Sequence, residues 1–178
     1  MEKHPRVFDR TVLCAPMIAF NRHGLPVIAG ALMCQTAVMR NQGECRFFAS
    51  APFDGNERVE DSCATGRERF EWYNHIRNTD PRFQNNGPTY SWLLQSLKAS
   101  QLLLAPGAVE RIACPVRLYS AEHDREVMDL AQKMFVRRLK KGHFIKVKES
   151  RHEIYRSEDE VLFPWWHEVL EFLEGKEA

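Results

Sequence analysis

The sequence lacks the features that would direct it into a membrane, onto nucleic acid or out of the cell. No run of apolar residues is long enough to cross a bilayer, and residues 1–5 do not resemble a signal peptide. The 25 basic and 24 acidic residues leave a formal net charge of +1, which gives no electrostatic reason to expect nucleic acid or an anionic membrane as the main partner. With 178 residues, 44% of them hydrophobic and 28% charged, the chain has the length and balance of one globular domain.

Paired cysteines and metal-binding spacings are also missing. The five cysteines include no C-x-x-C pair and their number is odd, so we expect free thiols in a reducing compartment, the cytoplasm. No cysteine follows a strand-to-helix turn with a histidine partner, which argues against a catalytic thiol. Because His123, Asp124, His152 and His167 show neither H-E-x-x-H nor C-x-x-C spacing, a metal site is the weaker interpretation of these residues. We expect no metal and no other cofactor.

The clearest pattern lies between residues 114 and 155. Residues 115–120 are rich in strand formers, and residues 144–147 resume an extended pattern. Between these strands apolar residues recur at helical spacing and predict one buried face, made of Val127, Leu130, Ala131, Met134, Phe135 and Leu139. Strand, helix and strand joined by short links form a right-handed parallel crossover, so the loops after both strands lie at one edge of the sheet. We therefore expect Asp124 and His152, one on each loop, to meet at the carboxyl edge of an α/β fold.

The rest of the chain is organised around this unit. Residues 11–15 predict a further buried strand, whereas residues 21–105 lose the alternation of strand and helix. Three amphipathic pieces occur within that segment, at residues 27–38, 67–76 and 89–104. We expect three parts: a core strand in 1–20, a helical cap inserted at 21–105 over the catalytic edge, and a C-terminal core at 106–178. The alternative is a helical subdomain that contributes stability alone.

A closing helix is expected after Tyr155. Ser157 and Glu160 have the S-x-x-E spacing of a capping box, and apolar residues continue as far as Leu173. Because Pro164 lies inside this pattern, we expect a kink or a split into a short turn and a longer helix.

Four segments resemble a known family. SAEHD and SRHEIYRSEDE, which contain Asp124 and His152, resemble the acid and histidine loops of the lysophospholipase and monoacylglycerol-lipase branch of the α/β-hydrolases. VLCAPM and RFQNNGPTYSWLLQSLKAS extend the resemblance, the second toward bacterial lysophospholipases of the inner-membrane-associated type. An acid and then a histidine, each after a parallel strand, match the last two members of a Ser…Asp…His triad. Since G-x-S-x-G is absent, we expect the C-terminal part of an α/β-hydrolase fold without its nucleophile elbow.

The resemblance implies a serine ester hydrolase that acts on lysophospholipids or monoacylglycerols and releases the fatty acid through an acyl-enzyme. His152 would be the general base and Asp124 the acid that orients it, with Glu122 as the rival for the acid role. The cap would form the acyl pocket, although aromatic residues at helical spacing are more often plain core. The candidate substrate-binding residues are Met17, Tyr90 and Trp92.

The partners expected from this resemblance are a lipid-like ester substrate and, as a peripheral contact, the inner face of a membrane. A partner chain is one source of the missing N-terminal half. The alternative function is non-catalytic, namely a truncated pseudoenzyme fragment that keeps the cap and binds lipid or a partner protein. The presence of G-x-S-x-G in a segment upstream or in a partner would discriminate between the two.

Overall fold

A sheet of three parallel strands organises the computed structural model, which describes residues 7–21, 24, 26–85 and 87–176. Its strands β1 (Thr11–Cys14), β2 (Val116–Ala121) and β3 (Gly142–Val147) lie in the order β1-β2-β3. The register sets Thr11 opposite Val116, and Val116 opposite Gly142. The parallel arrangement predicted from the sequence is therefore confirmed. Residues 1–6 of the expected segment 1–20 lie outside the described residues.

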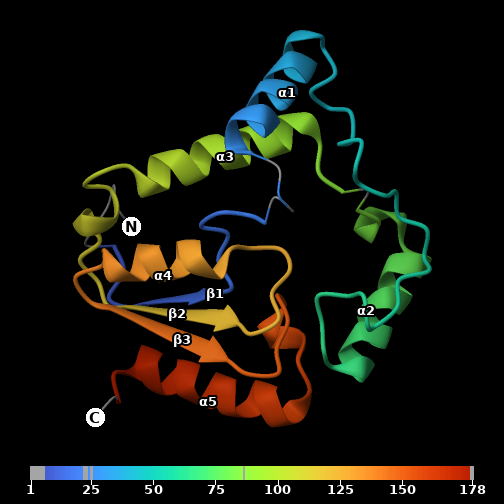
Figure 1. Ribbon diagram of the computed structural model, residues 1–178. Helices are drawn as coiled ribbons and strands as arrows, with labels where there is room; N and C mark the ends of the chain where they lie inside the picture. Colours follow the sequence, from blue (N-terminus) through green and yellow to red (C-terminus); the bar gives the residue numbers. More distant parts are fainter. Residues whose placement is uncertain (1–6, 22–23, 25, 86, 177–178) are drawn as a thin grey trace.

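Two helices cover the two faces of this sheet (Figure 1), as the alternation of side chains along β2 requires. On one face Val116 and Leu118 pack against Phe135 of α4 (Asp129–Arg137). On the other face Tyr119 meets Trp165 of α5 (Asp159–Glu174) edge to face, with ring centroids 5.8 Å apart. β2 is thus covered on both sides, and all of its residues except the half-buried Arg117 are buried.

The buried face of α4 differs from the prediction. Gln132, Phe135 and Val136 are buried, whereas Leu130 and Met134 are 60% and 53% exposed. The amide of Gln132 donates to the carbonyl oxygen of Pro16 at 3.0 Å, so a polar side chain takes a core position to bond a backbone group after β1. The prediction is confirmed for Val127 and Phe135, which are buried, and for Ala131 and Leu139, which pack against the core. It was wrong for Leu130 and Met134, because apolar periodicity cannot register such a hydrogen bond.

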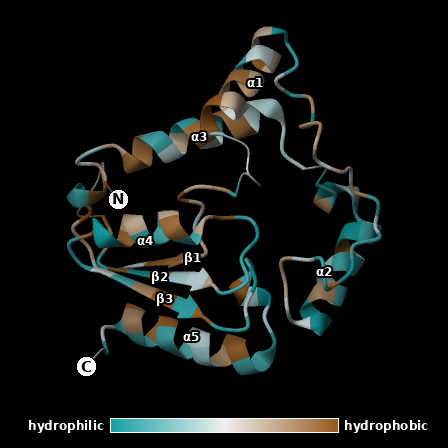
Figure 2. Ribbon diagram, viewed as in Figure 1, coloured by the Kyte–Doolittle hydropathy of each residue, from teal (hydrophilic) through white to brown (hydrophobic). Residues whose placement is uncertain are grey.

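The described residues between β1 and β2 form three α-helices and two short 3₁₀ turns. Its α1 packs against α3 on the outer side of α4, and α2 stands beyond the carboxyl ends of the strands (Figure 1). Figure 2 shows α1 as almost entirely apolar, whereas α2 is largely hydrophilic. No helix among the described residues is both long and apolar enough to cross a membrane. The elements are α1 (Val27–Met39), α2 (Arg67–Thr79), η1 (Pro81–Phe83), α3 (Tyr90–Leu104) and η2 (Val109–Arg111).

The closing helix α5 follows the 3₁₀ turn η3 (Ile154–Arg156) and differs from the prediction at its start. Its N-cap is Glu158, without a side-chain cap bond, so the capping box predicted for Ser157 and Glu160 was wrong. The carboxylate of Glu158 instead accepts the backbone N–H of Arg67 at the start of α2, at 3.0 Å. The helix also runs unbroken through Pro164, which is exposed, so that water can solvate the backbone carbonyl that loses its donor. The expected split was wrong.

Candidate functional site

The loops that follow β2 and β3 are held together by backbone hydrogen bonds at the carboxyl edge of the sheet. The N–H of Glu122 donates to Val147 and the N–H of His123 donates to Ser150, both at 3.0 Å. This contact brings the Nδ1 atom of His152 to 2.9 Å from the Oδ2 atom of Asp124. The predicted meeting of these two side chains is therefore confirmed as geometry.

Asp124 is fixed from both of its carboxylate oxygens. Oδ1 accepts the backbone N–H groups of Glu126 at 2.9 Å and Val127 at 3.1 Å, which leaves Oδ2 for His152. Burial by itself raises the pKa of Asp124, but the hydrogen bonds from His152 and from the two amides outweigh it, so that the pKa lies below its ordinary value. The group is therefore a carboxylate near neutral pH.

His152 is the accessible member of the pair, since its side chain is 30% exposed and that of Asp124 only 4%. The hydrogen bond to Asp124 raises the pKa of His152; burial opposes this, and the charges of Asp124, Glu126 and Glu153 add to the rise. Because a carboxylate accepts at Nδ1, the neutral ring carries its proton there and keeps its lone pair on Nε2. The arrangement can thus take up a proton at Nε2 while the carboxylate stabilises the resulting imidazolium.

The two alternative assignments for these loops do not match the geometry. The carboxylate of Glu122 accepts the backbone N–H of Glu149 at 2.8 Å, so this side chain braces the two loops and does not bond His152. His167 lies on α5, where its Nε2 is 3.3 Å from the carboxylate of Glu171. Within the described residues no three His, Cys, Asp or Glu side chains are grouped so as to hold a metal ion.

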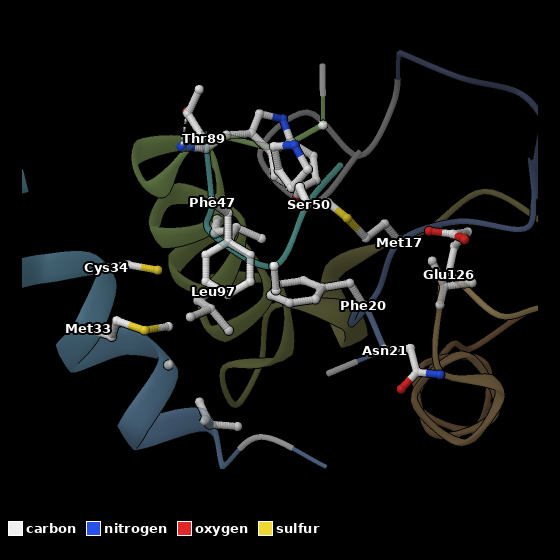
Figure 3. A pocket seen from close by; sticks show the side chains of 18 of the residues that line it. Met17, Phe20, Asn21, Met33, Cys34, Phe47, Ser50, Thr89, Leu97 and Glu126 are labelled. Carbon is white, nitrogen blue, oxygen red and sulfur yellow. Dashed lines mark hydrogen bonds between the residues drawn. The ribbon is translucent and has the colours of Figure 1, made fainter. Parts of the chain in front are cut away.

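A cavity of about 890 Å³ opens beside His152, between the sheet edge and helices α1 and α3 of the inserted segment. Figure 3 shows Phe20, Phe47 and Leu97 between the side chains of α1 and those of Met17 and Glu126. The wall is mainly apolar, as ligand pockets usually are. It combines residues of the inserted segment and of the loops that follow the strands, including Met17, Phe20, Val27, Met33, Cys34, Phe47, Cys63, Trp92, Leu97, Glu126, Val127 and His152.

The three candidate substrate-binding residues fall in different places. Met17 and Trp92 line the cavity. Tyr90 is not among the lining residues; its ring packs edge to face against Phe47, at 5.6 Å between centroids. Phe47 itself was missed, because it lies in an irregular stretch with no periodicity to mark it. Glu126 was also missed, although its position two residues after Asp124 was a usable signal.

Comparison with known proteins gives consistent results. The profile of the family described as serine aminopeptidase, S33, matches residues 1–160. Lysophospholipase L2 of Escherichia coli (strain K12) is 24% identical over 189 residues, a match that covers 97% of this chain and 52% of that protein. The chain therefore spans about half the length of the curated relatives that it matches.

Solved structures share the fold at low identity. A soluble variant of monoglyceride lipase from Saccharomyces cerevisiae superposes with a TM-score of 0.65 at 12% identity, over 93% of this chain and 55% of that one. The monoacylglycerol lipase of Paleococcus ferrophilus gives a TM-score of 0.63 at 15% identity, over 99% and 62% of the two chains. These likenesses confirm the expected fold class, an α/β-hydrolase sheet with flanking helices.

Proposed function

The chain belongs to the serine aminopeptidase S33 family of α/β-hydrolases, and on that premise we propose that it supplies the acid, the base and the acyl pocket of a carboxylic ester hydrolase. The substrate would be a lysophospholipid or a monoacylglycerol. One observation carries the proposal: the Asp124–His152 pair, with its 2.9 Å hydrogen bond, borders a large apolar cavity. The lysophospholipase relative supports the substrate class.

In the proposed reaction His152 takes the proton of a serine hydroxyl as the oxygen attacks the acyl carbonyl. The same proton passes to the leaving alkoxide, and the fatty acyl group remains on the serine. His152 then takes a proton from a water molecule as the water oxygen attacks the acyl-enzyme carbonyl. The bond to the serine oxygen breaks, His152 returns the proton to that oxygen, and the fatty acid leaves. Because this sequence contains no G-x-S-x-G, the serine and its oxyanion donors would come from a further segment or from a partner chain.

We assign residues 21–105 to the cap of this enzyme and residues 1–20 and 106–178 to its core. The cavity supports this division, because its wall combines α1 and α3 with residues that directly follow β1 and β2. The fatty acyl chain would lie among Phe20, Phe47 and Leu97, with its ester directed toward His152. A packing role alone would not require an open space of this size beside His152.

The outer face of α1 supports a peripheral membrane contact. This helix carries no charged residue, and Ile28, Leu32 and Met39 are 75%, 63% and 68% exposed. Exposed apolar side chains on a helix that also lines the cavity suit a surface from which lipid enters. The five cysteines are all free thiols, which supports a reducing compartment and hence the cytoplasmic side of that membrane.

A non-catalytic lipid-binding role is the second candidate, because the cavity forms in a sequence that lacks a nucleophile elbow. Both roles require lipid to bind in the cavity. In the 178-residue chain, Leu97→Asp should weaken the binding of a monoacylglycerol, because it places a charge in the apolar wall. Gln95→Asp, on the same helix but outside the wall, is the matched control. Equal binding by both variants would contradict the pocket assignment.

Catalysis separates the two roles. The chain alone should show no turnover and no labelling of any serine by a fluorophosphonate. Co-expression with a segment that carries a strand, G-x-S-x-G and a helix should restore labelling and ester hydrolysis. His152→Ala should then abolish hydrolysis, whereas His167→Ala, on the exposed side of α5, should not. Hydrolysis that survives His152→Ala would reject the enzymatic proposal.

A further inference from the structure

A short segment of the inserted region, residues 59–66, lies against the loop that carries His152. We call it the strap. It ends at Gly66, the N-cap of α2, and so connects that helix to the sheet edge. Ser62 closes the strap on itself, since its hydroxyl lies 3.0 Å from the carbonyl oxygen of Val59 and 3.1 Å from that of Ala64. Ala64 is fully buried, so the strap is part of the packed interior.

Arg151, the residue before His152, donates hydrogen bonds to three backbone carbonyl oxygens of the strap. Its Nη1 atom lies 2.5 Å from the oxygen of Val59, 3.1 Å from that of Ser62 and 3.0 Å from that of Ala64. Hydrogen bonds from a guanidinium to carbonyl oxygens are stronger than neutral ones, and here they add to the bonds that Ser62 makes to the carbonyls of Val59 and Ala64. The side chain therefore determines how the strap and the histidine loop fit together.

The residues after His152 bond the same strap through their backbone. The N–H of Glu153 donates to the carbonyl of Cys63 at 3.0 Å, and the N–H of Gly66 donates to that of Arg156 at 2.9 Å. His152 is thus held on both sides, by the Arg151 side chain before it and by the Glu153 amide after it. Cys63 also lines the cavity, so the strap is at once a cavity wall and the support of the histidine backbone.

We propose that Arg151 is a positioning residue, which holds the strap against the histidine loop and thereby keeps the ring of His152 on Asp124 and facing the cavity. The inference rests on the proposed role of His152 as the base. It goes beyond that role, because a displacement of the strap at the start of α2 would also displace His152 from Asp124. Loss of the guanidinium removes its bonds to three strap carbonyls, and the loop can then rotate His152 away from Asp124.

The protonation of His152 is a readout that distinguishes positioning from charge. Removing a nearby cation would by itself raise the pKa of a histidine, because it makes the imidazolium less unfavourable. Losing the hydrogen bond to Asp124 would lower the pKa, because that bond is the main cause of its elevation. The carboxylates that act on His152, those of Asp124, Glu126 and Glu153, are unchanged in an Arg151 variant. An Arg151 variant should therefore raise the pKa of His152 if only the charge of Arg151 matters, and lower it if Arg151 positions the ring.

The test uses the 178-residue chain labelled with ¹⁵N and follows the imidazole nitrogens by NMR across pH, with His152→Gln to assign the signal. Arg151→Met should lower the pKa of His152, as Asp124→Asn does, and should speed hydrogen exchange at the amide of Glu153. Arg151→Lys should fall between Arg151→Met and the unmodified chain, because an ammonium keeps the charge but lies on a shorter side chain, which reaches the strap carbonyls less well. The matched control is Arg69→Met, since Arg69 bonds Ser157 and Asp159 at the far end of the same contact and should leave His152 unchanged.

Several outcomes would overturn the inference. A folded Arg151→Met variant with an unchanged or raised pKa of His152 would show that Arg151 does not position the ring. An equal fall in Arg69→Met would show general loosening of the contact. If Arg151→Met does not fold, Arg151→Lys decides: a pKa and exchange rate equal to those of the unmodified chain reject positioning. Because the readout is protonation and not turnover, a fall in pKa without hydrolysis in the complemented enzyme would reject the proposed function alone.

Discussion

Gly66 offers the sharpest test of how closely the strap packs on the histidine loop. Its φ is −72°, which any residue can adopt, so an alanine there meets no backbone penalty. A Cβ atom would lie 2.7 Å from the carbonyl oxygen of Ser157 and 2.9 Å from that of Arg156. Ordinary contacts begin at 3.4 Å, and both neighbours are backbone atoms that cannot rotate away. Gly66→Ala therefore has to push the two segments apart by more than half an ångström.

The expected cost has two parts. Overpacking in a rigid interior costs about 1–3 kcal/mol. Separation of the segments also stretches the 2.9 Å hydrogen bond from Gly66 to Arg156, and a lost backbone bond of this kind costs about 1 kcal/mol. We expect Gly66→Ala to lower the free energy of unfolding by about 2–4 kcal/mol, a large part of the net stability of an ordinary domain.

Urea unfolding of the chain, followed by circular dichroism, measures this loss, and hydrogen exchange at the amides of Gly66 and Glu153 locates it. Gly43→Ala is the matched control, because its new methyl group would meet chiefly the rotatable hydroxyl of Ser91, at 2.4 Å. It should cost less than Gly66→Ala. A Gly66→Ala variant within about 0.5 kcal/mol of the unmodified chain, with unchanged exchange, would refute the close packing of strap and loop.

Three further predictions concern the acid–base pair, the core and a thiol. The Asp124–His152 interaction should stabilise the fold most between about pH 4 and 6.5. The contribution of Asp124 is lost as the pH falls through its folded pKa, which lies below 3.8, and that of His152 is lost as the pH rises through its folded pKa, which lies above 6.5. A double-mutant cycle measured across pH tests this prediction. Phe135→Ala should lower the free energy of unfolding in urea by about 3–5 kcal/mol, because Phe135 is buried. Leu130→Ser should change it by less than about 0.5 kcal/mol, because Leu130 is exposed. Equal losses would show that Leu130 is buried, as the sequence predicted. Burial raises the pKa of the Cys63 thiol to about 12, and nearby carboxylates add to the rise. Iodoacetamide should therefore modify Cys63 slowly at neutral pH in the native chain and faster once urea unfolds the chain. Rapid modification of the native chain would contradict this prediction.

Local patterns in the sequence were sufficient for the architecture. Strand-forming runs and helical periodicity predicted the three strands and the main helices to within a few residues, since these signals depend on neighbours along the chain. The rule that parallel strands end at one sheet edge then brought Asp124 and His152 together, although 28 residues separate them. Each step needed only the order of elements and the hand of the crossover.

Where the sequence misled, a contact with a distant segment had replaced the local preference. Gln132 turns into the core of α4 to bond Pro16, 116 residues earlier. The carboxylate of Glu158 accepts an N–H at the start of α2 and none from its own helix. Tyr90 packs on Phe47 and is not among the residues that line the cavity. Apolar periodicity and capping spacings do not indicate such partners, because these patterns depend only on residues within a few turns of one another along the chain.

The sequence by itself thus determined an α/β core with an acid and a histidine at one edge. Only the tertiary structure showed which residues line the cavity beside that pair and which contacts hold the pair in place. Arg151 meets the strap carbonyls across 87 to 92 residues of chain, and nothing in the composition of either segment marks the contact. Hydrogen bonds to backbone carbonyls carry no sequence signal on the accepting side, because every residue has that oxygen. Only the folding of the inserted segment back onto the sheet edge brings them within reach of the guanidinium.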